Sequence, residues 1–225
     1  MSDYQLYTLP NKTSIADNQT KQLALIEQNN VTYHKEGRLN SSLYFDGDYA
    51  AYFEKQHPAI YYIMENNQES NLGIPLPKGV IRFYENDSKG NLQFIGENTI
   101  GQTAKGEKIE LNLGTMFDVF IKGKVTDVRK VDERVLKDVA GTCPRYQITR
   151  GYDAQIVLHN GGDHESEVVF IQTLSQKATI TKENMESSVS DRNANQHEWR
   201  IKLPADSDQI LIFTVEVVQE ETRCR

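Results

Sequence analysis

The chain has 225 residues, enough to bury a sizeable core as one large β domain or as two smaller ones. Its formal net charge of −7 and its pI near 5.3 argue against nucleic acid and anionic membrane surfaces as partners, because both require a basic surface. No apolar run approaches the roughly 18 to 20 residues of a membrane span, so we expect no direct membrane insertion.

Short apolar segments and polar turns alternate through the first part of the chain. The residue types predict strands over 21–26 and 31–34, a break at Gly37 and Arg38 before 39–45, one helical turn over 50–55, and a strong strand over 59–64. Residues 65–70 are polar and predict a turn into the next segment.

Residues 71–97 form the segment around which we expect the architecture to be organised. Pro75 and Pro77 fix φ near about −65° and lack N–H donors, so residues 74–77 should run extended at an exposed, unpaired edge. After Gly79, residues 80–85 are apolar, β-branched and aromatic, as in a strand. Turn-forming residues at 86–91 and a return strand at 92–95 complete an expected antiparallel hairpin.

Alternation of apolar and polar residues dominates the second half of the chain. Residues 108–113 have a period of two, as in a strand with one buried face. Residues 119–136 and 146–158 predict one long hairpin, turned at 140–144 and bent near Gly123 and Gly151, where glycine permits a bulge. Residues 160–163 predict a hairpin turn with 167–174 as its return strand, and 178–181, 198–203 and 209–218 are the closing strands.

Turn signals recur about every 8 to 12 residues, and no long 3.6-residue period is present. The chain is therefore predicted to be all-β and sandwich-like. We expect one β subdomain over residues 1–117 and a second over 118–225, or one continuous domain. Trp199, Ile201 and Leu203 alternate with polar residues, so they should share one buried face.

One set of spaced residues follows the pattern of a known family. Its members are Asn67, Leu72, Gly73, Pro75, Leu76, Pro77, Gly79, Arg82, Tyr84, Glu85, Asp87, Gly90, Leu92, Gln93, Phe94, Gly96, Glu97, Ile100, Thr103, Gly106, Glu107, Leu111, Leu113, Gly114, Phe117, Asp118, Val119, Thr126, Asp127 and Arg129. Together they resemble the C-terminal domain of mucoidy inhibitor A-like proteins, a bacterial domain of unknown function. The detailed similarity covers residues 59–129, and a looser one continues through 146–160 and 166–174.

The resemblance implies an Ig-like or fibronectin-like β-sandwich, a periplasmic or cell-envelope location in a bacterium, and no established activity. Members of this family typically carry an N-terminal β domain and a coiled coil behind an export signal. The first residues here have neither a basic n-region nor an apolar h-region. We therefore expect either a piece of a longer exported protein or a cytoplasmic protein.

One constellation contains the ligand types of a metal site. Residues 159–165 hold two imidazoles and two carboxylates, which could bind Zn²⁺ or a similar ion. Adjacent residues of an extended chain point in different directions, so we expect a solvated turn and no metal. Asp46, Gly47 and Asp48 lack the ligand spacing of an EF-hand and predict an ordinary turn.

No group of residues has a clear catalytic signature. Glu85 with Asp87 and Asp132 with Glu133 are carboxylate pairs of the kind that a glycosidase uses as acid and base. A surface rich in carboxylates offers such pairs by chance, and no nucleophile motif accompanies them. His57 precedes a proline and is expected to end a loop. The chain is therefore predicted not to be an enzyme and to need no cofactor, with a hydrolase as a distant alternative.

Aromatic residues are concentrated between positions 44 and 62. They are Tyr44, Phe45, Tyr49, Tyr52, Phe53, Tyr61 and Tyr62. Exposed rings would stack on sugars or anchor a protein partner, whereas alternation along a strand would place some of them in the core. The candidate binding platform consists of Tyr44, Tyr49, Tyr52 and Phe53.

Two cysteines, Cys143 and Cys224, are too few for a disulfide scaffold. An oxidising compartment would favour a bond between them, closing a loop of about 80 residues. Two free thiols are the alternative, since a residue near the end of the chain frays easily and a cytoplasmic protein would keep both reduced.

Two binding functions remain open. In the first, the domain binds a protein partner, another copy of itself or another part of its own longer chain through sheet edges and aromatic loops. In the second, it binds carbohydrate through the aromatic segment 44–62. Coplanar exposed rings would favour sugar, whereas a flat apolar patch beside an open edge strand would favour protein.

Overall fold

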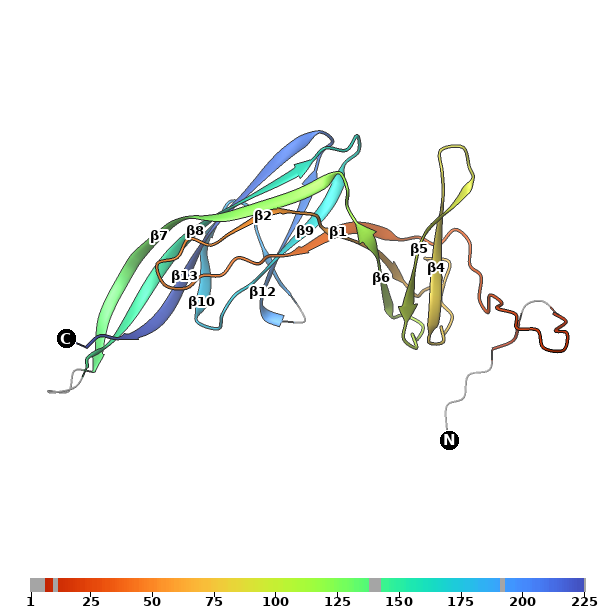
Figure 1. Cartoon of the computed structure of the whole chain (residues 1–225), viewed down its shortest axis with the longest axis horizontal. Coiled ribbons are helices and arrows are strands. Elements are labelled where there is room, and N and C mark those ends of the chain that lie inside the picture. The colour runs from red at the N-terminus through yellow and green to blue at the C-terminus, as the bar shows by residue number, and fades with distance from the viewer. Residues whose placement is uncertain (1–6, 10–11, 138–142, 191–192, 225) are drawn as a thin grey trace. The chain divides into compact units, whose positions relative to one another are not determined.

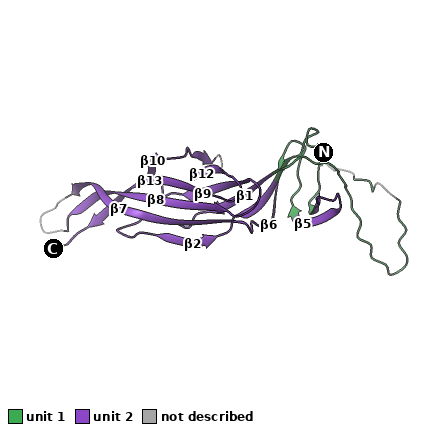
Figure 2. Cartoon of the chain, turned by 90° about the horizontal axis from the view of Figure 1, so that it is seen from above, with its two compact units in different colours: residues 1–34, 63–80, 99–109 green, residues 35–62, 81–98, 110–225 purple. Residues whose placement is uncertain are grey.

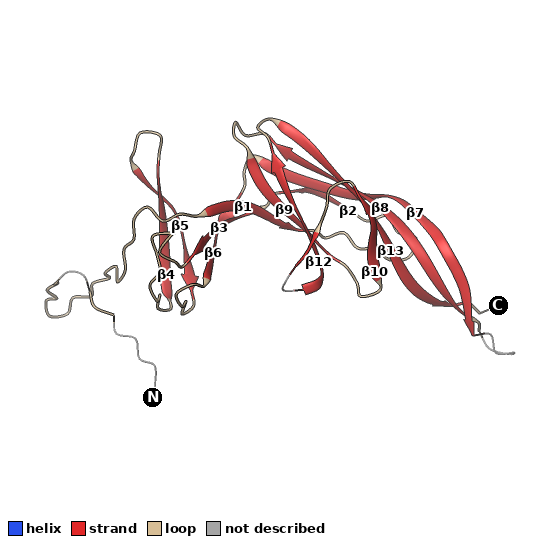
Figure 3. Cartoon of the chain, turned by 180° about the vertical axis from the view of Figure 1, so that it is seen from behind, coloured by secondary structure: helices blue, strands red, loops and turns tan. Residues whose placement is uncertain are grey.

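The computed structural model describes residues 7–9, 12–137, 143–190 and 193–224. The regular elements of these residues are all β-strands (Figures 1 and 3). The strands are β1 (His34–Asn40), β2 (Tyr52–Gln56), β3 (Ala59–Glu65), β4 (Gly79–Asn86), β5 (Leu92–Ile100), β6 (Lys108–Thr115), β7 (Val119–Lys137), β8 (Arg145–Asn160), β9 (Ser166–Thr173), β10 (Ala178–Glu183), β11 (Ser188–Ser190), β12 (Asn193–Leu203) and β13 (Ser207–Thr222). The predicted all-β class is confirmed. These described residues accordingly include no apolar helix that could span a membrane.

The strands form three sheets. One has the order β11-β12-β9-β1-β3-β6, the second has the order β10-β13-β8-β7-β2, and the third is the β4-β5 pair. In the second sheet β8 lies between β7 and β13 and pairs antiparallel with both over its whole length. In the first sheet β1 and β9 are parallel, with Gly37 opposite Val168 and Asn40 opposite Ile171.

The chain forms two compact units (Figure 2). Unit 1 comprises Met1–His34, Ile63–Val80 and Thr99–Ile109, and unit 2 comprises Lys35–Tyr62, Ile81–Asn98 and Glu110–Arg225. The subdomain boundary that the sequence places at residue 117 stays a prediction.

The core of unit 2 lies between the six-stranded and the five-stranded sheet, as in a β-sandwich. Trp199 of β12 stacks on Phe213 of β13, with ring centroids 4.8 Å apart. Trp199, Ile201 and Leu203 are all buried, which confirms that they share the inner face. Apolar side chains on alternate positions of both sheets therefore meet in one core.

The long hairpin predicted from the alternating pattern is confirmed as β7 and β8. Its turn was expected at 140–144, of which residues 140–142 lie outside the described residues. The bulges follow Val125, Lys130 and Val135, so the expectation that Gly123 and Gly151 form the bulges is wrong. Gly123 serves a different purpose, since a Cβ there would overlap the Phe53 ring and lie 2.7 Å from Ile156 Cδ1.

A disulfide joins Cys143 to Cys224, with the two Cα atoms 4.4 Å apart. Of the two alternatives for these cysteines, the bonded one is therefore found. The adjoining backbone is paired as well, because Arg223 N donates to the carbonyl oxygen of Pro144 at 3.1 Å. The β13 end of the sheet is thus linked covalently to the segment that leads into β8.

The predicted hairpin at 80–95 is confirmed as β4 and β5. Asp87 closes its turn, because Asp87 Oδ1 accepts hydrogen bonds from the backbone N of Lys89 (2.9 Å) and of Asn91 (2.8 Å). Tyr84 and Phe94 lie across the hairpin with ring centroids 5.4 Å apart. Local turn chemistry and cross-strand ring contact both favour this hairpin.

The unpaired, exposed edge expected at the two prolines is wrong at Leu76. This residue is buried and forms an isolated antiparallel bridge with Thr103, in which each backbone N donates to the other residue's carbonyl oxygen at 2.8 and 2.9 Å. Successive residues of an extended chain point their N–H groups to opposite sides. Pro75 and Pro77 therefore remove donors from one side only, and Leu76 keeps its own for Thr103.

Three expectations for the first part of the chain are wrong. Residues 21–26 form no strand, and the strand expected at 31–34 begins only at His34. The break expected at Gly37 and Arg38 is absent, because β1 runs through both. Glycine leaves room there for Met116 and Pro58, since a Cβ at position 37 would lie 2.5 Å from Met116 Sδ and 3.0 Å from Pro58 Cβ.

Two further expectations are wrong because tertiary contacts override local preference. The helical turn expected at 50–55 is replaced by β2, an edge strand that pairs with β7 and buries Phe53. The strand expected to return beside β8 after residues 160–163 is β9, which lies in the other sheet. Asn160 lies where the chain leaves β8, and its buried Nδ2 donates to the carbonyl oxygens of Leu203 (3.0 Å) and Pro204 (3.0 Å).

Candidate functional site

The aromatic residues of segment 44–62 divide into buried and exposed rings. Phe53 is buried against the core, whereas the side chains of Tyr44, Tyr49 and Tyr52 are 53%, 54% and 64% exposed. Tyr52 and Phe53 are neighbours on β2, so they must point to opposite faces of the sheet. The structure therefore brings three of the four proposed platform residues to the surface and removes Phe53 from it.

Tyr44 and Tyr49 stack on each other across the turn that separates them. Their ring centroids are 5.6 Å apart and their planes differ by 8°. Between them Phe45 turns inward and meets Tyr152 and Phe213 edge-on, with centroid distances of 5.6 and 6.2 Å. The segment that carries the exposed ring pair is thus anchored to the core by Phe45.

The turn at residues 46–48 is held by the five-stranded sheet. The Tyr152 hydroxyl donates to the carbonyl oxygen of Gly47 at 2.8 Å, and Arg150 Nε donates to Asp48 Oδ1 at 3.0 Å. Gln219 Nε2 donates to Asp46 Oδ1 at 2.8 Å. Both carboxylates of the predicted turn therefore bind side chains of the sheet, and the turn presents Tyr44 and Tyr49 rigidly.

A hollow of about 190 Å³ lies beside Tyr44. It is lined by Leu43, Tyr44, Phe45, Asp46, Thr173, Leu174, Ser175, Ala178 and Val217. One wall is fixed by Gln172, whose Nε2 donates to the carbonyl oxygen of Leu43 at 3.1 Å. We call this site the Tyr44 hollow. Its lining residues include the exposed Tyr44, the hydroxyl-bearing Thr173 and Ser175, the acidic Asp46 and several aliphatic residues.

The outward surface of the five-stranded sheet carries apolar side chains where polar ones are expected. Ile210 and Ile212 of β13 are 42% and 46% exposed. Opposite them lie Val157 and Gln155 of β8, and beyond these lie Lys122 and Lys124 of β7. Directly opposite residues of antiparallel strands project to the same side, so these residues share one surface. We call it the outer face.

Two acidic residues that project to the same side of the sheet have partners other than the lysines, since Asp208 pairs with His159 and Asp153 with Arg129. Among the residues that the structure describes, Lys122 and Lys124 make no ion pair. Tyr52 lies opposite Lys124 on the edge strand β2, and Lys55 Nζ lies 4.2 Å from the Phe120 ring centroid. The outer face is thus an apolar strip on β13 and β8 next to a basic strip on β7.

No strong sequence signal marked the outer face, but a weak one was present. Residues 210–213 are four consecutive apolar residues, whereas a strand with one solvated face should alternate. Leu211 and Phe213 are fully buried, so their neighbours Ile210 and Ile212 must face outward. The break in alternation therefore identifies the exposed apolar strip.

Charged residues of the six-stranded sheet form a ladder within unit 2. Arg38 donates to Glu36 through Nε (2.6 Å) and to Glu110 through Nη1 (2.9 Å), and Arg200 donates to both Glu36 and Glu167. Burial alone would raise the pKa of Glu36, but the hydrogen bonds from Arg200 and Arg38 outweigh it and hold that pKa below its usual value. This ladder satisfies a buried carboxylate and thereby stabilises the sheet.

The residues at 159–165 do not converge on one point. His159 Nδ1 lies 2.7 Å from Asp208 Oδ1 and its ring packs on Phe120, whereas His164 Nδ1 lies 2.5 Å from the Oδ1 of its neighbour Asp163. Each imidazole thus has its own carboxylate: the pair of His159 joins β8 to β13, and the pair of His164 lies in the loop between β8 and β9. This arrangement fits the solvated turn expected from the sequence.

One member of each carboxylate pair considered for catalysis makes local hydrogen bonds, as does His57. Asp87 caps its turn, and hydrogen bonds from Asn91 lower its pKa. Glu133 accepts hydrogen bonds from Arg223 Nη1 (2.6 Å) and from Lys130. His57 Nδ1 lies 2.9 Å from the carbonyl oxygen of Met116 and 2.8 Å from that of Val119.

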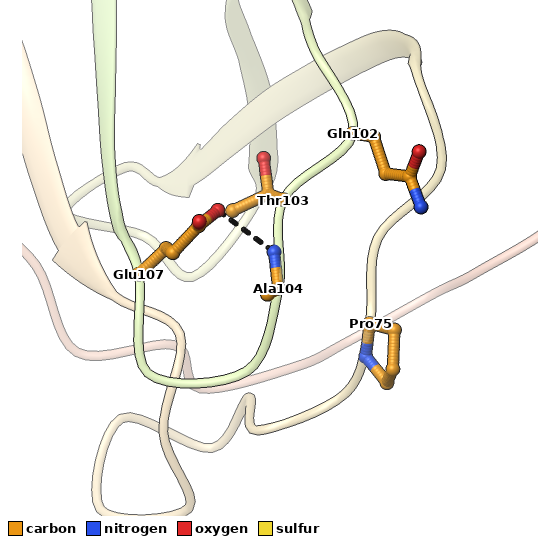
Figure 4. A pocket seen from close by; sticks show the side chains of 5 residues that line it. All are labelled: Pro75, Gln102, Thr103, Ala104 and Glu107. Carbon is orange, nitrogen blue, oxygen red and sulfur yellow. Dashed lines mark hydrogen bonds between the residues drawn. The ribbon is translucent and has the colours of Figure 1, made fainter. Parts of the chain in front are cut away.

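Unit 1 has a hollow of its own, of about 260 Å³ (Figure 4). It is lined by Pro75, Gln102, Thr103, Ala104 and Glu107, and Glu107 Oε2 accepts a hydrogen bond from Ala104 N at 2.8 Å. Nearby, buried Asn66 donates through Nδ2 to the carbonyl oxygens of Ile74 and Ala104, both at 2.8 Å. The only carboxylate among its lining residues therefore holds its own loop, and none of these residues is aromatic.

Comparison of the chain with protein-family models, with curated proteins and with solved structures finds no match.

Proposed function

We propose that this protein is a non-catalytic β module of the bacterial cell envelope that binds a protein partner through its outer face. The observation that carries the proposal is the exposure of Ile210 and Ile212 beside the unpaired Lys122 and Lys124. Exposed aliphatic side chains lose unfavourable contact with water when a partner covers them. A protein surface with an apolar centre and flanking carboxylates complements both strips.

Charge complementarity selects an acidic partner. The chain as a whole has a formal charge of −7, so a basic strip is a local departure from its average. Opposite charges across an interface steer encounter and fix orientation. Another part of the same longer chain would satisfy the same requirement if it carried acidic and apolar residues together.

The finer architecture and the location belong to the same proposal. An Ig-like or fibronectin-like sandwich is supported by two sheets around one core, and by the family resemblance carried by residues 59–129. A periplasmic or envelope location is supported by that resemblance and by the Cys143–Cys224 bond, since disulfides persist in oxidising compartments. The local engagement of the candidate acids and bases supports a non-catalytic role.

Site-specific photo-crosslinking tests the outer face. A photoreactive residue is placed at Ile212 and, as a matched control, at Val189 of β11, an exposed aliphatic residue in the other sheet. In envelope extracts, position 212 should give an adduct that position 189 does not. The captured protein, once purified, should bind the unmodified chain more weakly as salt rises, because salt screens the attraction.

Charge reversal completes the test. The double variant Lys122→Glu, Lys124→Glu should reduce association with the captured protein by about tenfold or more, since rim charges act mainly on the association rate. Identical adducts from both positions, or affinity unchanged by the double variant, would show that the outer face is not the binding surface. An adduct of twice the mass of the chain would identify a second copy as the occupant instead.

A further inference from the structure

We infer that the Tyr44 hollow is a carbohydrate-binding site for a single neutral pyranose. This inference uses residues separate from the outer face, so it stands independently of the proposed protein partner. It rests on three properties of the hollow: an oriented aromatic ring, residues with hydroxyl and carboxylate groups in the same lining, and a volume that fits one sugar ring.

The oriented aromatic ring is that of Tyr44. Tyr44 lines the hollow and Tyr49 does not, so Tyr49 supports the ring from the other side, at 5.6 Å and nearly parallel. The electron-rich face of an aromatic ring attracts the partly positive C–H groups on one face of a pyranose, much as it attracts the positive edge of another ring. Because Tyr49 holds Tyr44 in place, the stacking surface is formed before a sugar arrives.

The polar groups are Thr173, Ser175 and Asp46. The two hydroxyls come from the end of β9 and the turn before β10, and each both donates and accepts hydrogen bonds, as sugar hydroxyls do. Asp46 Oδ1 accepts a hydrogen bond from Gln219, and Oδ2 makes none with the described residues. A carboxylate oxygen beside a ring is a suitable acceptor for a sugar hydroxyl.

Size and charge define the ligand further. About 190 Å³ is smaller than the roughly 300 to 1,000 Å³ of pockets that enclose drug-sized ligands, so the hollow fits one sugar ring rather than an oligosaccharide. Asp46 lies in the hollow, and Asp48 follows two residues later in the same turn. These carboxylates repel an acidic sugar. The ligand is therefore a neutral hexose, free or at the end of a glycan.

Nuclear magnetic resonance titration of the whole chain provides the test. The probes are the methyl glycosides of glucose, galactose, mannose and N-acetylglucosamine, with glucuronic acid as the charged comparison. At least one neutral glycoside should shift the amide signals of Tyr44, Thr173 and Ser175 with a dissociation constant on the order of 1 mM, as expected for a small ligand in an open site.

Three variants separate stacking from general structure. Tyr44→Ala should weaken binding by about tenfold, and Tyr44→Phe should retain it, since the ring face remains. Tyr84→Ala is the matched control, because Tyr84 is also an exposed tyrosine in a ring pair but lies on the β4–β5 hairpin. The single tryptophan, Trp199, reports by fluorescence that each variant is folded.

Absence of shifts with all four neutral glycosides at about 100 mM, a hundredfold above the expected constant, would overturn the inference. Shifts that persist in Tyr44→Ala would place the sugar elsewhere and overturn it equally. Tighter binding of glucuronic acid than of glucose would contradict the neutral ligand. None of these results bears on the crosslinking experiment, because no residue of the outer face lines the Tyr44 hollow.

Discussion

Replacing Glu36 by glutamine tests whether the charged ladder stabilises the fold through charge. Glu36 is fully enclosed, and two arginines donate hydrogen bonds to its carboxylate. A hydrogen bond to a charged group contributes about 1.5 to 3 kcal/mol. Arg38 keeps Glu110, and Arg200 keeps Glu167 and is half exposed, so no charge is left buried without a partner and we expect a loss of about 1.5 to 3 kcal/mol.

The pH dependence gives the sign of the effect. The pKa of Glu36 is lowered in the folded protein from its ordinary value of 4.5. Its contribution is therefore fully present above pH 4.5 and is lost as the pH falls through the lower, folded-state pKa. The stability difference between the native chain and Glu36→Gln should be largest at neutral pH and shrink in acid.

Denaturant unfolding followed by Trp199 fluorescence measures this difference, since this residue lies in the core of the same unit. Glu97→Gln is the control, because Glu97 pairs with Arg82 on the exposed hairpin at 3.1 Å and should cost less than about 1 kcal/mol. A Glu36→Gln cost that stays constant from neutral to acid pH would refute the electrostatic reasoning and point to shape alone.

Three further predictions concern the packing and covalent structure of unit 2. Ile201→Ala should lower the free energy of unfolding by about 2 to 5 kcal/mol in chemical denaturation, and a loss below about 0.5 kcal/mol would contradict the assigned core face. Gly123→Ala should cost about 1 to 3 kcal/mol through overpacking. Gly101→Ala, whose Cβ would meet open space, should change stability by less than about 0.5 kcal/mol in the same assay. Equal losses in Gly123→Ala and Gly101→Ala would be evidence against the close approach of Phe53 to Gly123. Replacing Cys143 and Cys224 by serine should lower stability by up to about 4.5 kcal/mol without reductant, and a native chain indifferent to reductant would show that the bond contributes little.

Strands with one buried face were predictable from the sequence because their pattern is local. Residues of β7, β8 and β12 alternate strictly enough to indicate both element and inner face. The sequence could not indicate that glycine at position 37 continues β1, because the reason is the distant side chain of Met116. Nor could it assign β9 to the other sheet, because β9 pairs there with β1, which is far away in the sequence.

The candidate sites show the same division. The concentration of rings at 44–62 correctly indicated exposed tyrosines, whereas the burial of Phe53 depends on the space left by Gly123 on another strand. The Tyr44 hollow joins Asp46 to Thr173 and Ser175, which are far apart in the sequence. Such a site follows from the packing of two sheets and has no linear motif.

The central place of β8 constrains the order in which the five-stranded sheet can form during synthesis. β7 precedes β8 and can pair with it at once, but the other edge of β8 belongs to β13, and residues 161–206 must be made first. At roughly 5 to 20 residues per second, this segment takes several seconds to synthesise. During that interval the free edge of β8 can pair with other chains, and it carries apolar residues that are fully buried in the folded protein. The nascent chain is therefore most prone to aggregation between the emergence of β8 and that of β13, and a chaperone acting in this interval would protect it best.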